Sequence, residues 1–248
     1  MCAFNREKYI AEAIESVISQ TFQDWELIVI DDASNDKTEE IINPFLSDAR
    51  IRYIKNPLNL GLARNRIRGI EEVRGEYIAI LDSDDRWNDS TKLEKQCEFL
   101  DKNPECGVIG TFANVIDKNG NITDRLTYKT TDKTIRRNML FQDQIVNSSS
   151  LFRTSIINEI GNYDPTLAPA EDYDLFLRIG AENQFANLPF YMTDYRVHPE
   201  NSSSNNKQKK LNHAKLHLKV IKKFKNDYPN YFPALIKSYL RILKIFVW

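Results

Sequence analysis

LIVIDDAS at residues 27–34 and YIAILDSDD at residues 77–85 both contain an apolar run that ends in a group of acids. A continuous apolar run of this length is typical of a strand buried on both faces of a parallel sheet. Residues 10–18 and 61–73 instead place apolar side chains three or four positions apart, as amphipathic helices do. This alternation predicts an α/β fold in which helices flank a sheet.

The second half of the chain is expected to be mixed. Residues 108–116 predict a further strand, and Asn119-Gly120 supplies the residues that a tight hairpin turn requires. Residues 201–206 are rich in Ser and Asn and are the best candidate for a mobile loop. From residue 207 the sequence has a helical period among many lysines, so we expect a helical C-terminal tail.

The start of the chain differs from this pattern. Residues 1–5, MCAFN, lead directly into the first predicted helix, and no apolar run precedes it. A parallel sheet that lacks a strand exposes the hydrogen-bonding edge of its neighbour. We therefore expect the strand before the first helix to be missing, so that the first strand of the fold is truncated.

Composition excludes several classes of protein. The 248 residues fit one large α/β domain, and 42% hydrophobic with 28% charged residues is ordinary for a globular protein. A formal net charge of -1 predicts no nucleic-acid partner. The three cysteines lack metal-ligand spacing, and no secretion signal is recognisable, which favours a cytoplasmic protein.

The C-terminal stretch leaves two interpretations open. No apolar run is long enough to span a bilayer. Residues 236–248 are nevertheless apolar, with interspersed Lys and Arg side chains. They could pack as a terminal helix, or they could make peripheral contact with the inner face of a membrane.

The acids after the second apolar run are candidate metal ligands. Asp82, Asp84 and Asp85 lie at a strand-to-loop junction, where successive side chains diverge enough to address one hard cation. Carboxylate oxygens favour Mg²⁺ or Mn²⁺, which take one or two carboxylates together with substrate phosphates. The alternative is a solvated acidic loop that caps the next helix.

Asp31 and Asp32 close the first apolar run. A carboxylate at the end of such a strand can accept hydrogen bonds from a nucleobase or ribose. The alternative is that either acid caps the helix that follows. Because the carboxyl ends of neighbouring strands meet at one edge of the sheet, we expect both acidic groups to lie near each other.

Five short blocks, by their order and spacing, resemble glycosyltransferase family 2, a large family of inverting enzymes with a GT-A fold. They are FNRE at 4–7, IDDAS at 30–34, NLGLARN at 59–65, LDSDD at 81–85 and AEDYD at 170–174. The resemblance implies a GT-A-like, Rossmann-type mixed and mostly parallel sheet flanked by helices. It implies a catalytic domain of residues 1–206, which leaves residues 207–248 as a helical extension.

The resemblance also implies where the nucleoside of the donor binds. Phe4 and Asn5 would supply backbone contacts to the nucleobase. Asp32, or its neighbour Asp31, would bind a uracil-type base or its ribose.

For the diphosphate, the resemblance points to a second group of side chains. Arg64 would face the donor phosphates. Asp84, together with Asp82 and Asp85, would hold the Mg²⁺ or Mn²⁺ ion that bridges the diphosphate, and Asp84 would also contact the ribose. His198 would lie near the diphosphate or the metal. The alternatives are an exposed helix residue for Arg64 and a structural or surface histidine for His198.

The last block implies the catalytic base. Asp172 would accept the proton of the acceptor hydroxyl as that oxygen attacks the anomeric carbon opposite the leaving diphosphate, which inverts the configuration. Glu171 is its supporting neighbour. The alternative is that both acids only favour the positive end of the helix dipole.

Together these observations predict an inverting glycosyltransferase that moves a sugar from a nucleotide diphosphate sugar to a hydroxyl group. The expected donor is a UDP-sugar. The acceptor would be a saccharide or a lipid-linked saccharide, in cell-surface polysaccharide synthesis. Two alternatives remain open at this point. One is a noncatalytic nucleotide-sugar-binding module, and the other is a sugar nucleotidyltransferase, whose Gly-rich basic loop is absent near the amino terminus.

Overall fold

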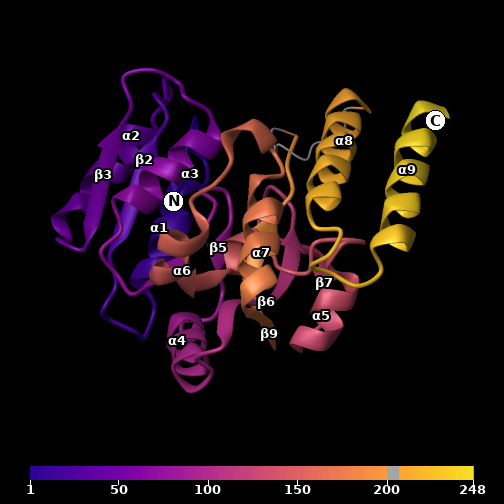
Figure 1. The fold of residues 1–248 in the computed structure, drawn as a ribbon. Helices are drawn as coiled ribbons and strands as arrows, with labels where there is room; N and C mark the ends of the chain where they lie inside the picture. Colours follow the sequence, from indigo (N-terminus) through magenta and orange to yellow (C-terminus); the bar gives the residue numbers. More distant parts are fainter. Residues whose placement is uncertain (200–206, 248) are drawn as a thin grey trace.

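The N-terminal part of the chain forms a parallel sheet. In the computed structural model, which describes residues 1–199 and 207–247, the strand order is β1 (Cys2–Ala3), β2 (Leu27–Asp31) and β3 (Ile51–Lys55). Both pairings are parallel. Three helices accompany these strands, namely α1 (Ile10–Ile18), α2 (Thr38–Ile42) and α3 (Leu62–Glu71), with a short 3-10 helix η1 (Asn43–Ser47). The predicted α/β alternation is confirmed here (Figure 1).

The expectation that the first strand is missing is wrong. Residues of β1 pair with β2, with Cys2 opposite Ile30 and Ala3 opposite Asp31. The amide of Ile30 donates to the carbonyl of Met1 at 2.9 Å, and the amide of Asp32 donates to the carbonyl of Ala3 at 2.8 Å. The strand is short, but its backbone satisfies the edge of β2 beside the acids.

A second, six-stranded sheet follows in the chain. Its order is β4 (Tyr77–Ala79), β8 (Leu151–Arg153), β6 (Cys106–Ile116), β9 (Gln184–Arg196) and β5 (Arg86–Trp87), and β7 (Ile122–Leu126) pairs with β6. Only β6 and β9 pair in parallel; the other pairings are antiparallel. The predicted hairpin at Asn119-Gly120 joins β6 to β7, and Gly120 has the positive φ of 86° that such a turn requires. The fold is therefore mixed: the first sheet is parallel throughout, and the second joins the long parallel pair β6–β9 to antiparallel neighbours.

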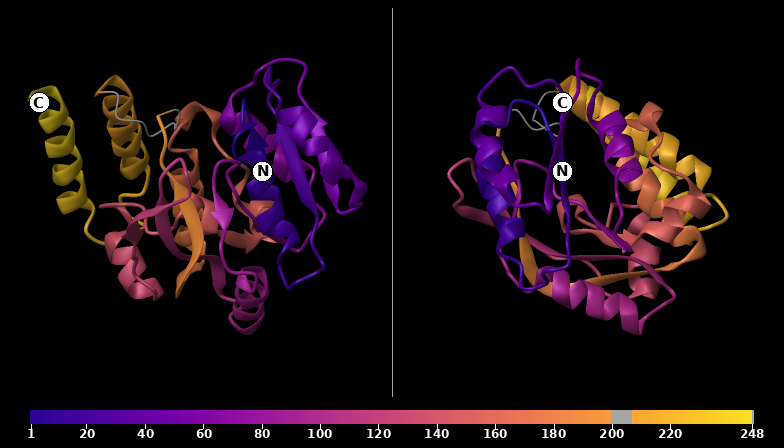
Figure 2. Two further views of the ribbon diagram at one scale, coloured as in Figure 1. Left: turned by 180° about the vertical axis from the view of Figure 1, so that it is seen from behind. Right: turned by 90° about the vertical axis from the view of Figure 1, so that its left-hand side faces the viewer.

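The remaining helices surround this second sheet. They are α4 (Lys92–Lys102), α5 (Asp132–Met139), α6 (Thr154–Ile160), α7 (Glu171–Glu182), α8 (Lys207–Lys223) and α9 (Tyr231–Val247), with 3-10 turns η2 (Asn147–Ser149) and η3 (Pro165–Leu167). The helices α8 and α9 lie at the end of the molecule opposite β3 and α2, as Figures 1 and 2 show. The helical tail is therefore confirmed. The loop predicted at residues 201–206 lies outside the described residues.

The tail shares a hydrophobic core with α7. Side chains of α7 and α8 belong to one buried cluster, which includes Leu175, Phe176, Val220 and Ile221. No helix within residues 1–199 and 207–247 is both long and apolar enough to cross a membrane. The packing therefore holds α8 against the helix that begins with Glu171 and Asp172.

Candidate active site

One large cavity lies between the first sheet and the helical tail. Its volume is about 740 Å³, which is within the range of small-molecule sites. Asp32 after β2, Asp84 after β4 and Asp172 at the start of α7 all line it. Three acidic blocks that are up to 140 residues apart in the chain (172 less 32) therefore meet around one space. The other lining residues used below are Phe4, Arg6, Arg66, Asp82, Tyr128, Asp143, Asn147, Glu171, Tyr173, His213, His217 and Arg241.

The two acids at the end of β2, Asp31 and Asp32, have different surroundings. Asp32 lines the cavity, and its carboxylate accepts from the amides of Leu60 at 2.7 Å and Gly61 at 2.9 Å. Burial opposes the charge, but these amides and neighbouring side-chain amides outweigh it and lower the pKa of Asp32. Asp31 is not a lining residue; it is fully buried, and its carboxylate accepts from Tyr53 Oη at 2.5 Å and from the Ser34 amide at 2.9 Å.

The acids after β4 also separate. Asp82 and Asp84 line the cavity, whereas Asp85 points into the protein and accepts from the amide of Arg196 at 2.8 Å and from the hydroxyl of Ser148. Burial, together with the charges of Asp84 and Asp82, raises the pKa of Asp85 well above its usual value. The structure therefore does not place Asp85 where a metal ligand would have to lie. A strand-to-loop junction turns alternate side chains in different directions, and the direction of each follows from the loop conformation.

His198 lies beside Asp84. Its Nε2 atom is 2.9 Å from Oδ2 of Asp84, and the histidine is buried. Arg6 approaches the same oxygen, with Nη2 at 3.6 Å. His198 does not itself line the cavity, but it contacts a carboxylate that does, and Tyr9 packs against its ring at 5.1 Å between centroids.

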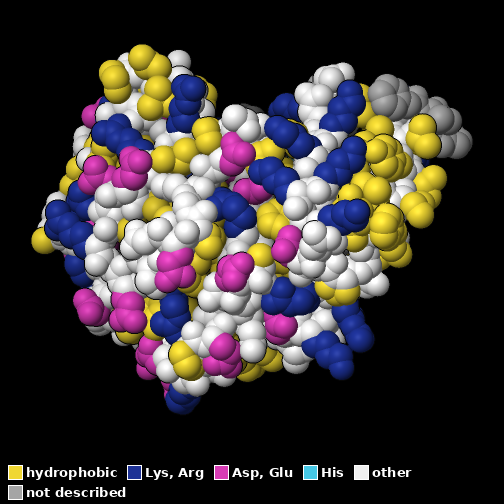
Figure 3. All heavy atoms as spheres, viewed as in Figure 1, with side chains coloured by type: hydrophobic (Ala, Val, Ile, Leu, Met, Phe, Trp, Pro, Cys, Tyr) yellow, Lys and Arg dark blue, Asp and Glu magenta, His cyan; other side chains and the backbone are white. Residues whose placement is uncertain are grey.

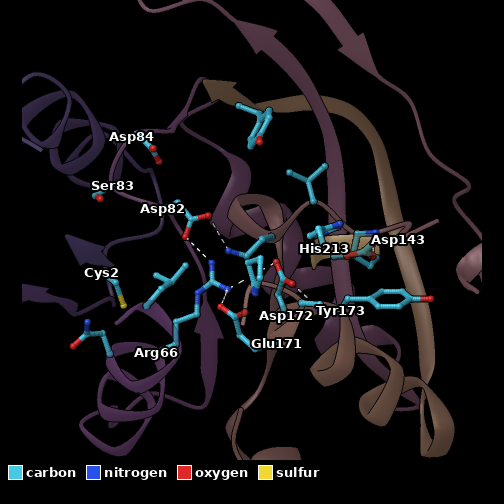
Figure 4. Close-up of a pocket in the computed structure, with 18 of the residues that line it drawn as sticks. Cys2, Arg66, Asp82, Ser83, Asp84, Asp143, Glu171, Asp172, Tyr173 and His213 are labelled. Atoms are coloured by element: carbon cyan, nitrogen blue, oxygen red, sulfur yellow. Dashed lines mark hydrogen bonds and ion pairs between the residues drawn. The ribbon is translucent and has the colours of Figure 1, made fainter. Parts of the chain in front are cut away.

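A buried arginine connects the acids on both sides of the cavity. Arg66, on α3, donates from Nη2 to Asp82 at 3.0 Å and from Nη1 to Glu171 at 2.8 Å, and Nη1 lies 3.8 Å from Asp172. Figure 4 shows this row of side chains, with Arg66 between Asp82 and the Glu171-Asp172 pair. Burial alone would lower the pKa of Arg66, but these carboxylates raise it well above its ordinary value.

Arg64 does not lie in this cavity. Its side chain is exposed on α3, and Arg66, two positions further along the helix, lines the cavity instead. The sequence contains a signal for this. Ala63, Arg66 and Ile70 are buried at i, i+3 and i+7, so Arg66 lies on the inward stripe of the helix.

Glu171 and Asp172 begin α7. Burial raises the pKa of Glu171, against the lowering effect of Arg66. One oxygen of Glu171, Oε1, is held by Arg66, and the other, Oε2, is buried without a hydrogen-bond partner in the described chain. Asp172 is more open, with a quarter of its side chain exposed (25%), and its Oδ1 accepts from the amide of Tyr173 at 2.7 Å. Of the two acids, Asp172 is thus the one that a substrate can reach.

Phe4 and Asn5, of the first sequence motif, also differ in whether they line the cavity. Phe4 lines the cavity and is 41% exposed. Asn5 does not line it, and has a positive φ of 53°. Its Oδ1 accepts from the amide of Asn35 at 3.0 Å, and its own amide donates to Ser34 at 2.9 Å, so it holds two loops together.

The sequence motifs do not include the residues that line the far half of the cavity. Tyr128, Asp143, His213, His217 and Arg241 line it, from the loops around α5 and from the helices α8 and α9. Burial and the charge of Asp172 raise the pKa of Asp143 well above its usual value. No local pattern marks these residues, because only the packing of the tail brings them to Asp172.

The three predicted metal ligands do not form a ready cage. The described residues contain no group of three or more His, Cys, Asp and Glu side chains arranged to hold a metal ion. Asp82 is engaged by Arg66 and, at 3.1 Å, by Asn147 Nδ2. Asp84 nevertheless places a carboxylate oxygen on the cavity wall, a donor that suits a divalent ion completed by phosphate oxygens, and His198 holds that carboxylate from the protein side.

Comparison with solved structures shows the same fold. The TarS protein of S. aureus in complex with UDP-GlcNAc superposes with a TM-score of 0.76 at 20% identity, over 98% of this chain and 71% of that one. The mannosyltransferase PcManGT from Pyrobaculum calidifontis, in complex with GDP-Man and Mn²⁺, superposes with a TM-score of 0.71 at 15% identity, over 99% of this chain and 71% of that one. At these identities the likeness concerns the fold alone.

Sequence comparison is more specific. An uncharacterized glycosyltransferase of Methanocaldococcus jannaschii is 34% identical over 236 residues, which cover 92% of this chain and 81% of that protein. The Escherichia coli protein WfgD, a UDP-Glc:alpha-D-GlcNAc-diphosphoundecaprenol beta-1,3-glucosyltransferase, is 30% identical over 216 residues, or 85% of this chain and 80% of that protein. The family model described as Glycosyl transferase family 2 matches residues 1–161. The chain belongs to glycosyltransferase family 2, and it is a glycosyltransferase.

Proposed function

We propose that this glycosyltransferase moves a sugar from a nucleotide diphosphate sugar, in particular a UDP-sugar, to an acceptor hydroxyl with inversion at the anomeric carbon. The observation that carries the proposal is the convergence of Asp32, Asp84 and Asp172 on one cavity. In this proposal Asp32 serves the nucleoside, Asp84 the diphosphate and Asp172 the attacking hydroxyl.

The half of the cavity next to the first sheet would bind the nucleoside. Asp32 lies there with a lowered pKa, so it is a charged acceptor for the N–H groups of a base or the hydroxyls of a ribose. Phe4, exposed on the same wall, offers an aromatic surface for the base. A uridine nucleotide is supported by a relative that uses UDP-Glc and by a structural neighbour in complex with UDP-GlcNAc.

The diphosphate would lie near Asp84. We propose that Asp84 holds a Mg²⁺ or Mn²⁺ ion, with Asp82 close by and His198 orienting the Asp84 carboxylate, and a structural neighbour in complex with Mn²⁺ supports this choice. When bound, such an ion stabilises the negative charge of the leaving nucleoside diphosphate. Arg6, at 3.6 Å from Asp84, lines the same wall and is a cation of this chain that can contact the phosphates directly.

Asp172 would be the general base. It lines the cavity at the start of α7 and is partly open, so an acceptor hydroxyl can approach its carboxylate. It would accept the hydroxyl proton as the oxygen bonds to the anomeric carbon and the diphosphate leaves from the opposite face. Glu171 would position it, because Glu171 is fixed by Arg66, and Arg66 also contacts Asp82 on the donor side.

The acceptor would occupy the half of the cavity lined by α8 and α9. We propose a saccharide or lipid-linked saccharide there, in cell-surface polysaccharide synthesis, because a relative acts on a diphosphoundecaprenol-linked sugar. In this scheme residues 1–206 are the catalytic domain, and residues 207–248 are an extension that completes the acceptor side. We propose a cytoplasmic setting for the reaction.

Donor turnover by Asp172→Asn tests the assignment. The variant should bind UDP with unchanged affinity by calorimetry and lose transfer by at least about a hundredfold, because the amide cannot accept the proton. Release of UDP from a UDP-sugar is the readout, since a nucleotidyltransferase would release pyrophosphate. If the unmodified protein binds UDP but turns over no nucleotide sugar in an acceptor screen, a noncatalytic binding module is the better description. Unchanged transfer by the variant would exclude Asp172 as the base.

A further inference from the structure

Helix α9 carries an apolar face that the rest of the protein leaves uncovered. Five large side chains on it are between 45% and 65% exposed: Phe232, Ile236, Tyr239, Leu240 and Leu243. With 100° between successive residues, they fall within an arc of about 100° on one side of the helix. The opposite side holds Ala234 and Ser238, which are buried against the protein. The face is thus one continuous stripe and not a set of scattered residues.

The rest of the described surface has no comparable group. Other large apolar side chains that are exposed lie on separate elements, for example Leu46 on η1, Ile122 on β7 and Phe190 on β9. Isolated exposed apolar residues are normal on a soluble surface, whereas a contiguous stripe indicates a contact with something else. Figure 3 shows apolar side chains gathered over α9 at the right-hand end of the molecule.

The charge around this stripe has one sign. Helix α8 contains seven lysines and α9 contains Lys237, Arg241 and Lys244, and neither helix contains an Asp or Glu. The chain as a whole has a net charge of only -1, so this concentration of cations is local. Figure 3 shows Lys and Arg side chains over α8, next to the apolar stripe. A surface of apolar side chains flanked by Lys and Arg complements an anionic lipid interface.

The same two helices form a wall of the cavity. Arg241 of α9 lines it, as do His213 and His217 of α8. His217 stacks on Tyr173, the residue after Asp172. The stripe on α9 therefore lies on the element that borders the acceptor side of the site.

We propose that α9 docks on an anionic lipid surface through its exposed apolar stripe, with the lysines of α8 and α9 against the lipid headgroups. Arg241 lies on the side of α9 turned away from the stripe, so the docking would hold the acceptor side of the cavity one helix diameter from the lipid, within reach of an acceptor anchored there. The docking itself does not depend on the proposed function; only its purpose does. A neutral partner, or a second copy of the chain, would not pair with the Lys and Arg side chains that flank the stripe.

Vesicle co-sedimentation of the full chain tests this proposal. The unmodified protein should sediment with vesicles of phosphatidylcholine that contain phosphatidylglycerol, and much less with phosphatidylcholine alone. The double variant Ile236→Glu/Leu240→Glu should reduce the bound fraction about tenfold, because it places two charges in the centre of the stripe. The matched control is Ile122→Glu/Phe190→Glu, at side chains with similar exposure outside α8 and α9, and it should bind as the unmodified protein does.

Three results would overturn the proposal. They are equal sedimentation of the α9 variant and the control, equal binding to neutral and anionic vesicles, and a dimer in solution that the α9 substitutions alone dissociate. UDP affinity, measured by calorimetry on the same proteins without vesicles, should be the same in all of them. If the unmodified protein does not bind UDP, the proposed function is wrong. The vesicle result then still decides whether α9 docks on lipid.

Discussion

The imidazole ring of His217 lies flat against the phenol ring of Tyr173, with centroids 4.5 Å apart and an angle of 8° between the planes. Burial lowers the pKa of His217 to about 3, so the ring is neutral near physiological pH and stacks as an uncharged aromatic. Tyr173 also donates from its hydroxyl to the carbonyl of Met139 at 2.8 Å. The C-terminal tail thus fixes the residue that follows Asp172.

His217→Ala should loosen this arrangement. We expect a loss of about 2 kcal/mol in the free energy of unfolding, from the lost stacking and the cavity that remains. We also expect about a tenfold lower kcat with unchanged UDP affinity, because Asp172 is held less firmly while the donor half is untouched. Urea denaturation, calorimetry and steady-state kinetics measure the three quantities. His217→Phe should recover most of both losses, and a kcat that stays low in this variant would contradict a positioning role.

Arg66 and Arg64 should behave very differently, although they are two residues apart on α3. Arg66→Met leaves the buried Glu171 and the partly buried Asp82 without their cation, so we expect a loss of about 4 kcal/mol in the free energy of unfolding. Arg64→Met changes an exposed side chain, and should stay within about 0.5 kcal/mol. Chemical denaturation measures both. Similar losses in the two variants would mean that the buried ion pairs do not contribute as the structure indicates.

Asp84 and Asp85 should separate in metal-dependent binding. Asp84→Asn should weaken Mn²⁺-dependent affinity for UDP by at least about tenfold, because it removes a charged oxygen donor from the cavity wall. Asp85→Asn should leave that affinity unchanged, because the buried side chain faces Ser148 and Arg196. Calorimetry with and without Mn²⁺ makes the comparison. An equal loss in both variants would return Asp85 to the list of metal ligands.

Lys92 should make stability depend on pH. Its amine is fully buried, donates to Gln96 Oε1 at 2.6 Å and lies 4.2 Å from the centroid of the Trp87 ring. Burial lowers the pKa of Lys92 to about 7, from 10.5. Between these values the unfolded chain binds more protons, so the free energy of unfolding should rise with pH by up to about 1.4 kcal/mol per unit, and should fall as pH drops towards 7.

Lys92→Met should remove this slope. It should also raise stability near neutral pH, because the cost of burying the amine disappears. Denaturation curves between about pH 7 and about pH 9 measure the effect. Lys95→Met, on the same helix but at a side chain that is 42% exposed, is the control and should retain the slope. A slope that survives in the Lys92 variant would have to come from another group.

Much of the fold could be predicted from local patterns. The strand of residues 27–30, the helix of residues 10–18 and the hairpin at Asn119-Gly120 occur where their spacing and turn residues indicated. The error at the amino terminus has a clear cause. A two-residue strand has no periodicity of its own, and only its pairing with β2 defines it.

The site could be predicted in part. The motifs indicated Asp32, Asp84 and Asp172, and all three line the cavity. The sequence could not predict which acid of each adjacent pair faces away from the cavity. Asp31 and Asp85 face away, although each is next to an acid that lines it. Arg66 carried a signal in its helical spacing, whereas Asp143 and Arg241 carried none.

The sequence by itself determined the family, the α/β character and the acids that follow each apolar strand, because these depend on local spacing and on short motifs. The tertiary structure decided which of those acids share a cavity, that Arg66 joins them in place of Arg64, and that α8 and α9 form the wall beside Asp172. The physical reason is that the direction of a side chain at a loop junction, and the burial of a charge, depend on contacts between segments far apart in the chain. Neighbouring residues in the sequence do not specify those contacts.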